Sequence, residues 1–438
     1  MARIYFNDYP DKFMNIKFPP VATELMFSVQ FERREDYKGQ FGFDWMRDNY
    51  ESICNNYEEL KKEYATPMIS GEEYFVPWLS MFPNQGKSED DKEKRVVLKL
   101  KSTIFTGKPK KGDIVKLSAK NGIRFVPNEI KVKELVKETK GVDITIFCDN
   151  ALAEDTTIDL LDKYDNVVGK ITLVKNDEDL VLKVKLVKVM GDEINNTYNK
   201  KNFDDMSEDW VSRLFNNLSN ECFNQALIKI EKDSIEEMPI KVDDYIKKGI
   251  LDREKGIQIP RYNKGFDKIL YNDYVKENGE YNGIIFFLSA IYQKGMEAGH
   301  ARPHPRDINY IMIVPSSVGG ILDTYRHELG HALGLYHSSE GNDSHQKSVQ
   351  TMIRKYENKT DEERKTKVRY KGNIYSSNEY LDLKKKELIE LKQLSPKFLF
   401  EDASTNNFME KSNATEQISF WKWQWATMVE DLKLYHNE

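Results

Sequence analysis

The chain has 438 residues, with Lys+Arg 66 against Asp+Glu 72 and a net charge of −6. Apolar residues make up 39%, too many for a disordered chain, and the length predicts two or three domains. The acidic balance argues against a nucleic-acid partner, three cysteines are too few for a disulfide scaffold, and no apolar run approaches the ~20 residues of a membrane span.

The N-terminal stretch reads MARIYFNDYPDKFMNIKF, with charges and a proline where a signal peptide has its apolar core. We therefore predict no Sec signal peptide in this sequence and synthesis in the cytoplasm. Three explanations stay open: a mature form, a protein that stays inside the cell, or export by a leaderless route.

The first half of the chain divides by composition. Residues 1–90 form a mixed region with helical spacing over 43–64 and an aromatic run at 74–78. Over 91–190, short segments alternate between apolar and polar residues and are separated by turn clusters. Such alternation is typical of strands with one buried face. It predicts a β-sandwich-like accessory domain that includes the strand at 182–186.

Residues 191–207 are polar and rich in Asn and Lys, which predicts a linker. The spacing then becomes helical, and residues 208–438 are expected to form a second domain. Strands are expected at 283–291 and 308–314, a charged, irregular or part-helical segment at 355–397, and an amphipathic helix near the C-terminus. If this division is right, a fragment beginning near Asp204 folds on its own.

Three of the seven histidines lie in one window, His327-Glu328-Leu329-Gly330-His331-Ala332-Leu333-Gly334-Leu335-Tyr336-His337. On a helix, His327 and His331 project from the same face and can share one tetrahedral zinc ion. Glu328 is then placed to act as a general base on a zinc-bound water. Gly334 permits a turn that ends the helix and brings His337 back as the third ligand.

The pattern H-E-x-x-H-x-x-G-x-x-H resembles that of the metzincin zinc endopeptidases, and the resemblance covers residues 205–438. It implies one catalytic Zn²⁺ and an α+β domain with a twisted sheet, an active-site helix and a C-terminal helix. It also implies a methionine turn beneath the metal, for which we identify Met352. Some metzincins have a metal-approaching tyrosine two residues later. Arg354 stands there, so Tyr356 is the remaining candidate.

Two weaker resemblances concern the surroundings of the site. Gly299-His300-Ala301-Arg302-Pro303 is similar to a stretch near the cleft rim of pappalysin-type metzincins. His300 and His304 are therefore expected at the rim, with a second metal site as the alternative. Residues 74–85 resemble N-terminal regions of type VI secretion-associated proteins, which implies a secretion apparatus or an inhibitor as partner.

The expected function is zinc-dependent hydrolysis of a protein or peptide substrate, in a secreted effector or toxin-like protease. The alternative is a non-catalytic binding or secretion-adaptor protein that uses a protease-like domain for recognition. Residues 1–190 could cover the cleft as a latency segment or serve as a targeting module. No zinc-blocking cysteine motif is found there, which favours targeting.

Overall fold

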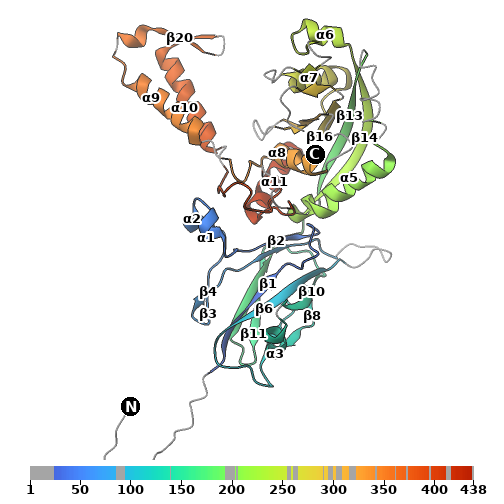
Figure 1. Cartoon of the computed structure of the whole chain (residues 1–438), viewed down its shortest axis with the longest axis vertical. Helices are drawn as coiled ribbons and strands as arrows, with labels where there is room; N and C mark the ends of the chain where they lie inside the picture. The colour runs from blue at the N-terminus through green and yellow to red at the C-terminus, as the bar shows by residue number, and fades with distance from the viewer. Residues whose placement is uncertain are drawn as a thin grey trace, which may run out of the picture.

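The computed structural model describes residues 24–84, 94–138, 140–192, 203, 206–253, 258–259, 265–289, 291–293, 299–301, 308–314, 322–340, 343–360, 362–370, 373–393, 396–410 and 416–436. Within them, several sheets and helices form two layered units that Figure 1 shows one above the other. No described helix has the length and apolar character needed to cross a membrane.

The first unit is a β-sandwich over residues 26–173. One sheet has the order β1-β6-β10-β8 and the other β2-β5-β12-β11-β7-β9, with antiparallel neighbours except for the parallel pair β5 and β12. Alternate side chains face inward and form one core, as β6 illustrates with buried Val96, Leu98 and Leu100. The elements are β1 (Met26–Glu32), β2 (Gly42–Asp44), β5 (Trp78–Ser80), β6 (Val96–Thr106), β7 (Ile114–Leu117), β8 (Ile123–Val126), β9 (Glu129–Lys131), α3 (Val132–Lys137), β10 (Val142–Cys148), β11 (Thr156–Asp162) and β12 (Val167–Leu173).

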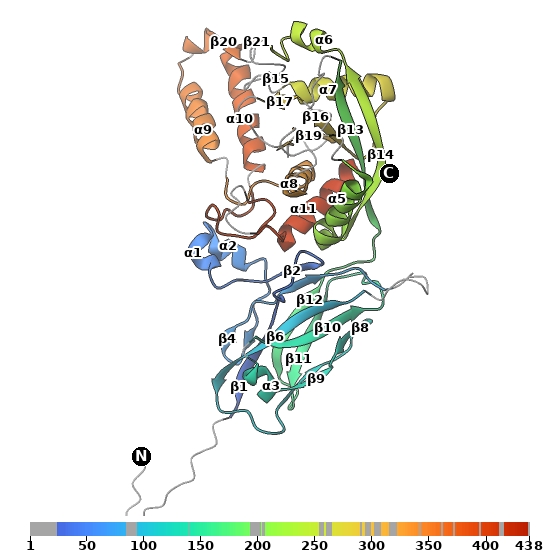
Figure 2. The same ribbon diagram turned by 45° about the vertical axis from the view of Figure 1, so that its right-hand side comes forward.

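The second unit has three layers around a sheet of order β14-β13-β16-β19-β18 (Figure 2). Its first four strands run parallel, and β18 is antiparallel to β19. Helices α5, α8 and α11 cover one face, and α6 and α7 cover the other. The elements are β13 (Leu180–Gly191), α5 (Glu208–Glu221), η1 (Phe223–Ala226), β14 (Ile228–Ile240), α6 (Val242–Lys247), β15 (Gln258–Ile259), α7 (Phe266–Asn278), β16 (Ile284–Ser289), β17 (Tyr292–Gln293), β18 (Gly299–His300), β19 (Tyr310–Ile313), α8 (Leu322–Ala332) and α11 (Lys422–Tyr435).

The sheet pairing corrects the expected domain limits. β13 lies between β14 and β16, so residues 180–191 belong to the second unit and not to the sandwich. Residues 1–90 were expected to form a region separate from the sandwich, but strands β1, β2 and β5 of this region belong to its two sheets. The units therefore divide between residues 173 and 180. The alternation of β13 was misleading because Lys185, which the pattern assigned to a solvent face, has partners in the second unit: its Nζ lies 2.9 Å from Glu236 Oε1 and 3.2 Å from the Tyr274 hydroxyl.

A short helical segment joins the two units. It comprises α1 (Tyr50–Ile53) and α2 (Tyr57–Lys61), two short helices in place of the longer helix expected over 43–64. The short strands β3 (Met68–Ile69) and β4 (Glu72–Glu73) follow. Trp421 Nε1 donates to the Tyr50 hydroxyl at 2.8 Å, and the Lys422 amide donates to Asp44 Oδ2 at 3.0 Å. One aromatic core spans the junction: Tyr50, Leu60, Tyr64, Phe398, Phe400, Trp421 and Trp423.

Residues 343–393 form a projection that we call the arm. It consists of α9 (Asp343–Glu357), η2 (Glu363–Lys365), β20 (Lys367–Tyr370), β21 (Asn373–Ser376) and α10 (Ser377–Gln393). Its helices and strands pack mainly on one another, around Val349, Ile353 and Leu391. Figures 1 and 2 both show α9 and α10 side by side and pointing away from the sandwich.

Candidate metal centre

Helix α8 carries the first two histidines and ends so that the chain returns with the third. His327 and His331 lie one turn apart, and the helix stops at Ala332. Gly334 adopts φ +83°, a conformation that side chains other than glycine's rarely tolerate. The Gly334 amide then donates to the His331 carbonyl at 2.9 Å and the Leu335 amide to the Gly330 carbonyl at 3.0 Å, the paired bonds of a Schellman helix end.

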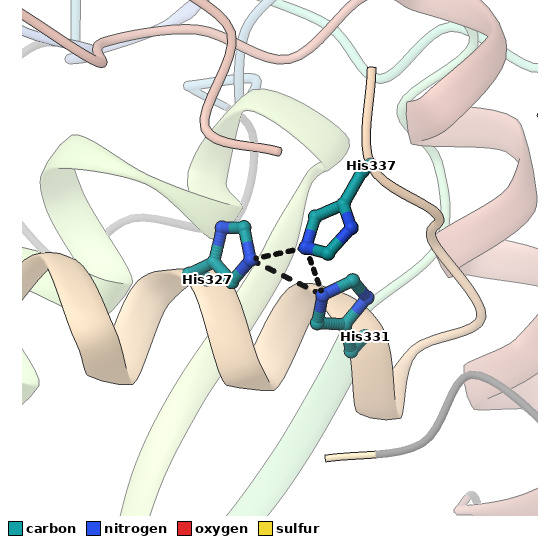
Figure 3. A group of neighbouring side chains, drawn as sticks. All are labelled: His327, His331 and His337. Carbon is teal, nitrogen blue, oxygen red and sulfur yellow. Dashed lines mark hydrogen bonds between the residues drawn. The ribbon is translucent and has the colours of Figure 1, made fainter. Parts of the chain in front are cut away.

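The three imidazoles converge on one point (Figure 3). Their Nε2 atoms are 3.0 Å apart between His327 and His337, 3.1 Å between His327 and His331, and 3.2 Å between His331 and His337. Tetrahedral zinc at ~2.0–2.1 Å from each nitrogen requires separations of roughly 3.3 Å. The cluster therefore fits a zinc ion with minimal adjustment, and it is the one metal-competent group found among the described His, Cys, Asp and Glu residues.

The opposite ring nitrogens are all bonded, which fixes how each ring is turned. The Nδ1 atom of His327 lies 2.9 Å from the Phe408 carbonyl, and that of His331 lies 2.7 Å from the Leu335 carbonyl. The Nδ1 atom of His337 lies 2.9 Å from Glu340 Oε2. Because a carbonyl accepts only from N–H, the first two rings carry their proton on Nδ1. Their Nε2 lone pairs are thereby left for a metal.

Burial keeps the rings of His327 and His331 neutral. Desolvation lowers the pKa of His327 to about 4, although its bond to the Phe408 carbonyl acts in the opposite direction. Desolvation and the neighbouring imidazoles lower the pKa of His331 well below its ordinary value. Metal ligation requires neutral imidazole, so the pair is ready to bind metal at neutral pH.

Glu328 belongs to α8, and its side chain lies against strand β18. The glutamate is 8% exposed. A Cβ atom on Gly299 would lie 2.7 Å from Glu328 Cγ and 3.1 Å from Glu328 Cδ, so only glycine leaves room for this side chain. The carboxyl group is therefore held beside the last strand of the described sheet, one residue from a histidine of the cluster.

His300 is also near the cluster. It lies on β18, opposite Met312 of β19, and is half-buried. Its charge is among the causes that lower the pKa of His331. His304 and the side chain of His345 lie outside the described residues.

The expected methionine turn at Met352 is wrong. Met352 lies within helix α9 and is 40% exposed. The methionine that contacts the histidine helix is Met409, which is fully buried; its Sδ lies 2.6 Å from the Cβ position of Gly330. Its neighbour Phe408 supplies the carbonyl that binds His327.

Met409 cannot be identified from its distance to His337 along the chain, because the arm separates the two residues by 72 positions. A usable signal was present: Phe408-Met409 is an apolar pair within the polar run ASTNNFMEKSN. The Tyr356 ring packs 4.9 Å from that of Tyr380, inside the arm. The half-buried Tyr356 therefore packs within the arm.

A ladder of backbone bonds holds the loop that carries His337. The Ser338 amide donates to the Met409 carbonyl, and the Phe400 amide donates to the Ser338 carbonyl, both at 2.9 Å. The Glu401 amide in turn donates to the Ile53 carbonyl at 2.9 Å. The third histidine is thus connected through residues 399–401 to the helical segment that joins the two units.

Comparison with known proteins adds little. No protein-family model matches the sequence, and no curated protein matches it. Among solved structures, the chain is similar to one titled "Structure of a chaperone-substrate complex", with 12% identity and a TM-score of 0.26. The match covers 68% of this chain and 40% of that chain, so this chain spans less than half the length of that relative. A likeness of this size carries no argument.

Proposed function

We propose that this chain is a zinc-dependent endopeptidase of the metzincin type. One observation carries the proposal: three Nε2 atoms lie 3.0–3.2 Å apart while each Nδ1 atom is bonded elsewhere. Three histidine ligands leave one position of a tetrahedral ion open, which is characteristic of catalytic zinc sites rather than structural ones.

Zinc held by His327, His331 and His337 would supply a Lewis acid for water activation and carbonyl polarisation. Glu328 is the proton carrier in this proposal. Its carboxylate accepts a proton from the attacking water as the water oxygen bonds to the scissile carbonyl carbon. It then delivers that proton to the nitrogen as the C–N bond breaks.

The end strand of the sheet favours an extended peptide as substrate. β18 pairs with β19 on one side, and β18 is the last strand in the described order. Extended peptides bind to such strands through backbone hydrogen bonds. A peptide added there would lie beside Glu328, because Gly299 of β18 is in contact with that side chain. A secreted effector role, leaderless export and an inhibitor or secretion partner stay predictions from sequence.

The test combines metal content with peptide-bond cleavage. We expect one zinc per full-length chain, cleavage of unfolded casein, and loss of cleavage in a chelator that zinc restores. Glu328→Ala should keep its zinc and lose activity by a factor of about 10³ or more, as expected for loss of a general base together with its electrostatic role. Unchanged activity in Glu328→Ala would contradict the mechanism, and a chain that excludes zinc would contradict the site.

A further inference from the structure

The arm, residues 343–393, contributes no ligand to the metal centre among its described residues. Both of its ends, however, lie close in the chain to residues that hold the loop of His337. It begins shortly after His337 and Glu340, and the chain that follows it pairs back through the bond from the Phe400 amide to the Ser338 carbonyl. Between these ends its helices and strands pack around a small core of their own. Both ends of the arm are therefore anchored at the loop that carries His337.

The arm is basic although the whole chain is acidic. Residues 343–393 contain 13 Lys and Arg against nine Asp and Glu. On α9, Lys347, Arg354 and Lys355 are exposed on the face opposite the buried Val349 and Ile353. None of these three cations forms an ion pair with a described residue, in contrast to Lys385, which lies 2.8 Å from Glu357.

The arm also exposes large apolar side chains. Met352 is 40% exposed, Ile389 57% and Ile374 65%. They lie on α9, α10 and β21, so apolar and basic groups are interspersed over the arm. A basic surface attracts partners of opposite charge, and exposed apolar side chains supply contacts for apolar residues of such a partner.

We propose that the arm is an exosite that binds acidic segments of the protein substrate, with apolar residues interspersed among the acidic ones. This inference rests on the proposed peptidase function. Charge complementarity selects acidic sequences, and the connection beside His337 delivers them to the metal centre. The nine acidic residues of the arm disfavour a uniform polyanion such as nucleic acid or an anionic membrane.

Binding can be measured without catalysis. The full-length Glu328→Ala chain is titrated into a fluorescein-labelled peptide rich in Glu with interspersed Leu, and into a matched peptide with Gln in place of Glu. The test variant adds Arg354→Gln and Lys355→Gln. The matched control adds Lys133→Gln and Lys137→Gln on α3, two exposed lysines of the sandwich, so that the net charge changes equally.

We expect the acidic peptide to bind more tightly than its Gln counterpart, and less tightly as salt rises. The arm variant should raise its dissociation constant about five- to tenfold, while the sandwich control leaves it unchanged. In chains with an intact Glu328, the arm variant should raise KM for casein and leave cleavage of a short neutral peptide unchanged.

Equal binding by the arm variant and the control would overturn the exosite. Tighter binding to phosphatidylserine vesicles than to the acidic peptide, lost in the arm variant, would overturn it in favour of a membrane surface. Failure of the peptidase function has a separate sign: no peptide is cleaved, whatever the arm binds.

Discussion

Three hydrogen bonds orient the histidine rings, and one of them, from His337, is made to a side chain, the carboxylate of Glu340. The other two ring orientations are set by carbonyls, which substitution does not remove. We expect Glu340→Ala to weaken zinc affinity by about 10–100-fold, because His337 loses the acceptor that orients it. Glu340→Gln keeps an acceptor oxygen and should restore most of the affinity.

Zinc competition with a chromophoric chelator measures the effect of Glu340. The thermal unfolding of the metal-free variants serves as the control, since the Glu340 side chain is 49% exposed and contributes little to stability. Equal zinc affinity in Glu340→Ala and the parent would show that the loop alone fixes His337.

Gly299 matters through the space it leaves for Glu328. In Gly299→Ala, the new Cβ would lie 2.7 Å from Glu328 Cγ and 2.8 Å from Thr324 Cγ2. The glutamate must move, so we expect kcat to fall at least ~10-fold while zinc is retained. Gly112→Ala, where a Cβ has open space, is the control. Normal turnover in Gly299→Ala would mean that the position of Glu328 is not critical.

At the scale of elements, helix α8 and the turn at Met409 form one closely packed contact. Alanine within a helix is normally more stable than glycine by about 1 kcal/mol. At Gly330 we expect the opposite sign, a loss of about 1–3 kcal/mol in the free energy of unfolding, because the new Cβ would overlap Met409 Sδ.

A double-mutant cycle isolates this contact. Met409→Val should remove the overlap, so Gly330→Ala should cost less in the Met409→Val background than in the parent, with a coupling of about 0.5–3 kcal/mol. Denaturant unfolding measures all four proteins. Additive effects would contradict direct contact between the two positions.

The metal ligands could be read from the sequence because they depend on local geometry. His327, His331 and His337 lie within eleven residues, and one helical turn plus one glycine turn brings them together. Met409 could not be placed in this way, because its contact with α8 is non-local: the whole arm lies between the two in the sequence. The pairing of β13 is similarly non-local, because alternation identifies a strand but not its neighbours.

At the scale of the whole molecule, the pairing of β13 alters the expected result of truncation. A fragment beginning at Asp204 lacks the strand between β14 and β16. We now expect it to be insoluble or to lack a near-ultraviolet dichroism signal. A fragment beginning at Asp177 keeps the whole sheet and should unfold cooperatively.

The Asp177 fragment should still be less stable than the full chain. It loses Tyr50 and Leu60, which cover Phe400 and Trp421 in the shared core. Denaturant midpoints of the fragment and the full chain provide the comparison. A well-folded Asp204 fragment would contradict the strand order.

The ladder from Ser338 to Met409 also determines when the metal centre can form during synthesis. The ribosome makes His327 82 residues before Met409 and 95 residues before the first residue of helix α11. A nascent chain therefore lacks the support of its histidine helix until translation has passed Met409 and helix α11. Under the proposed function, the order of synthesis itself would delay proteolytic activity until these later residues have emerged from the ribosome.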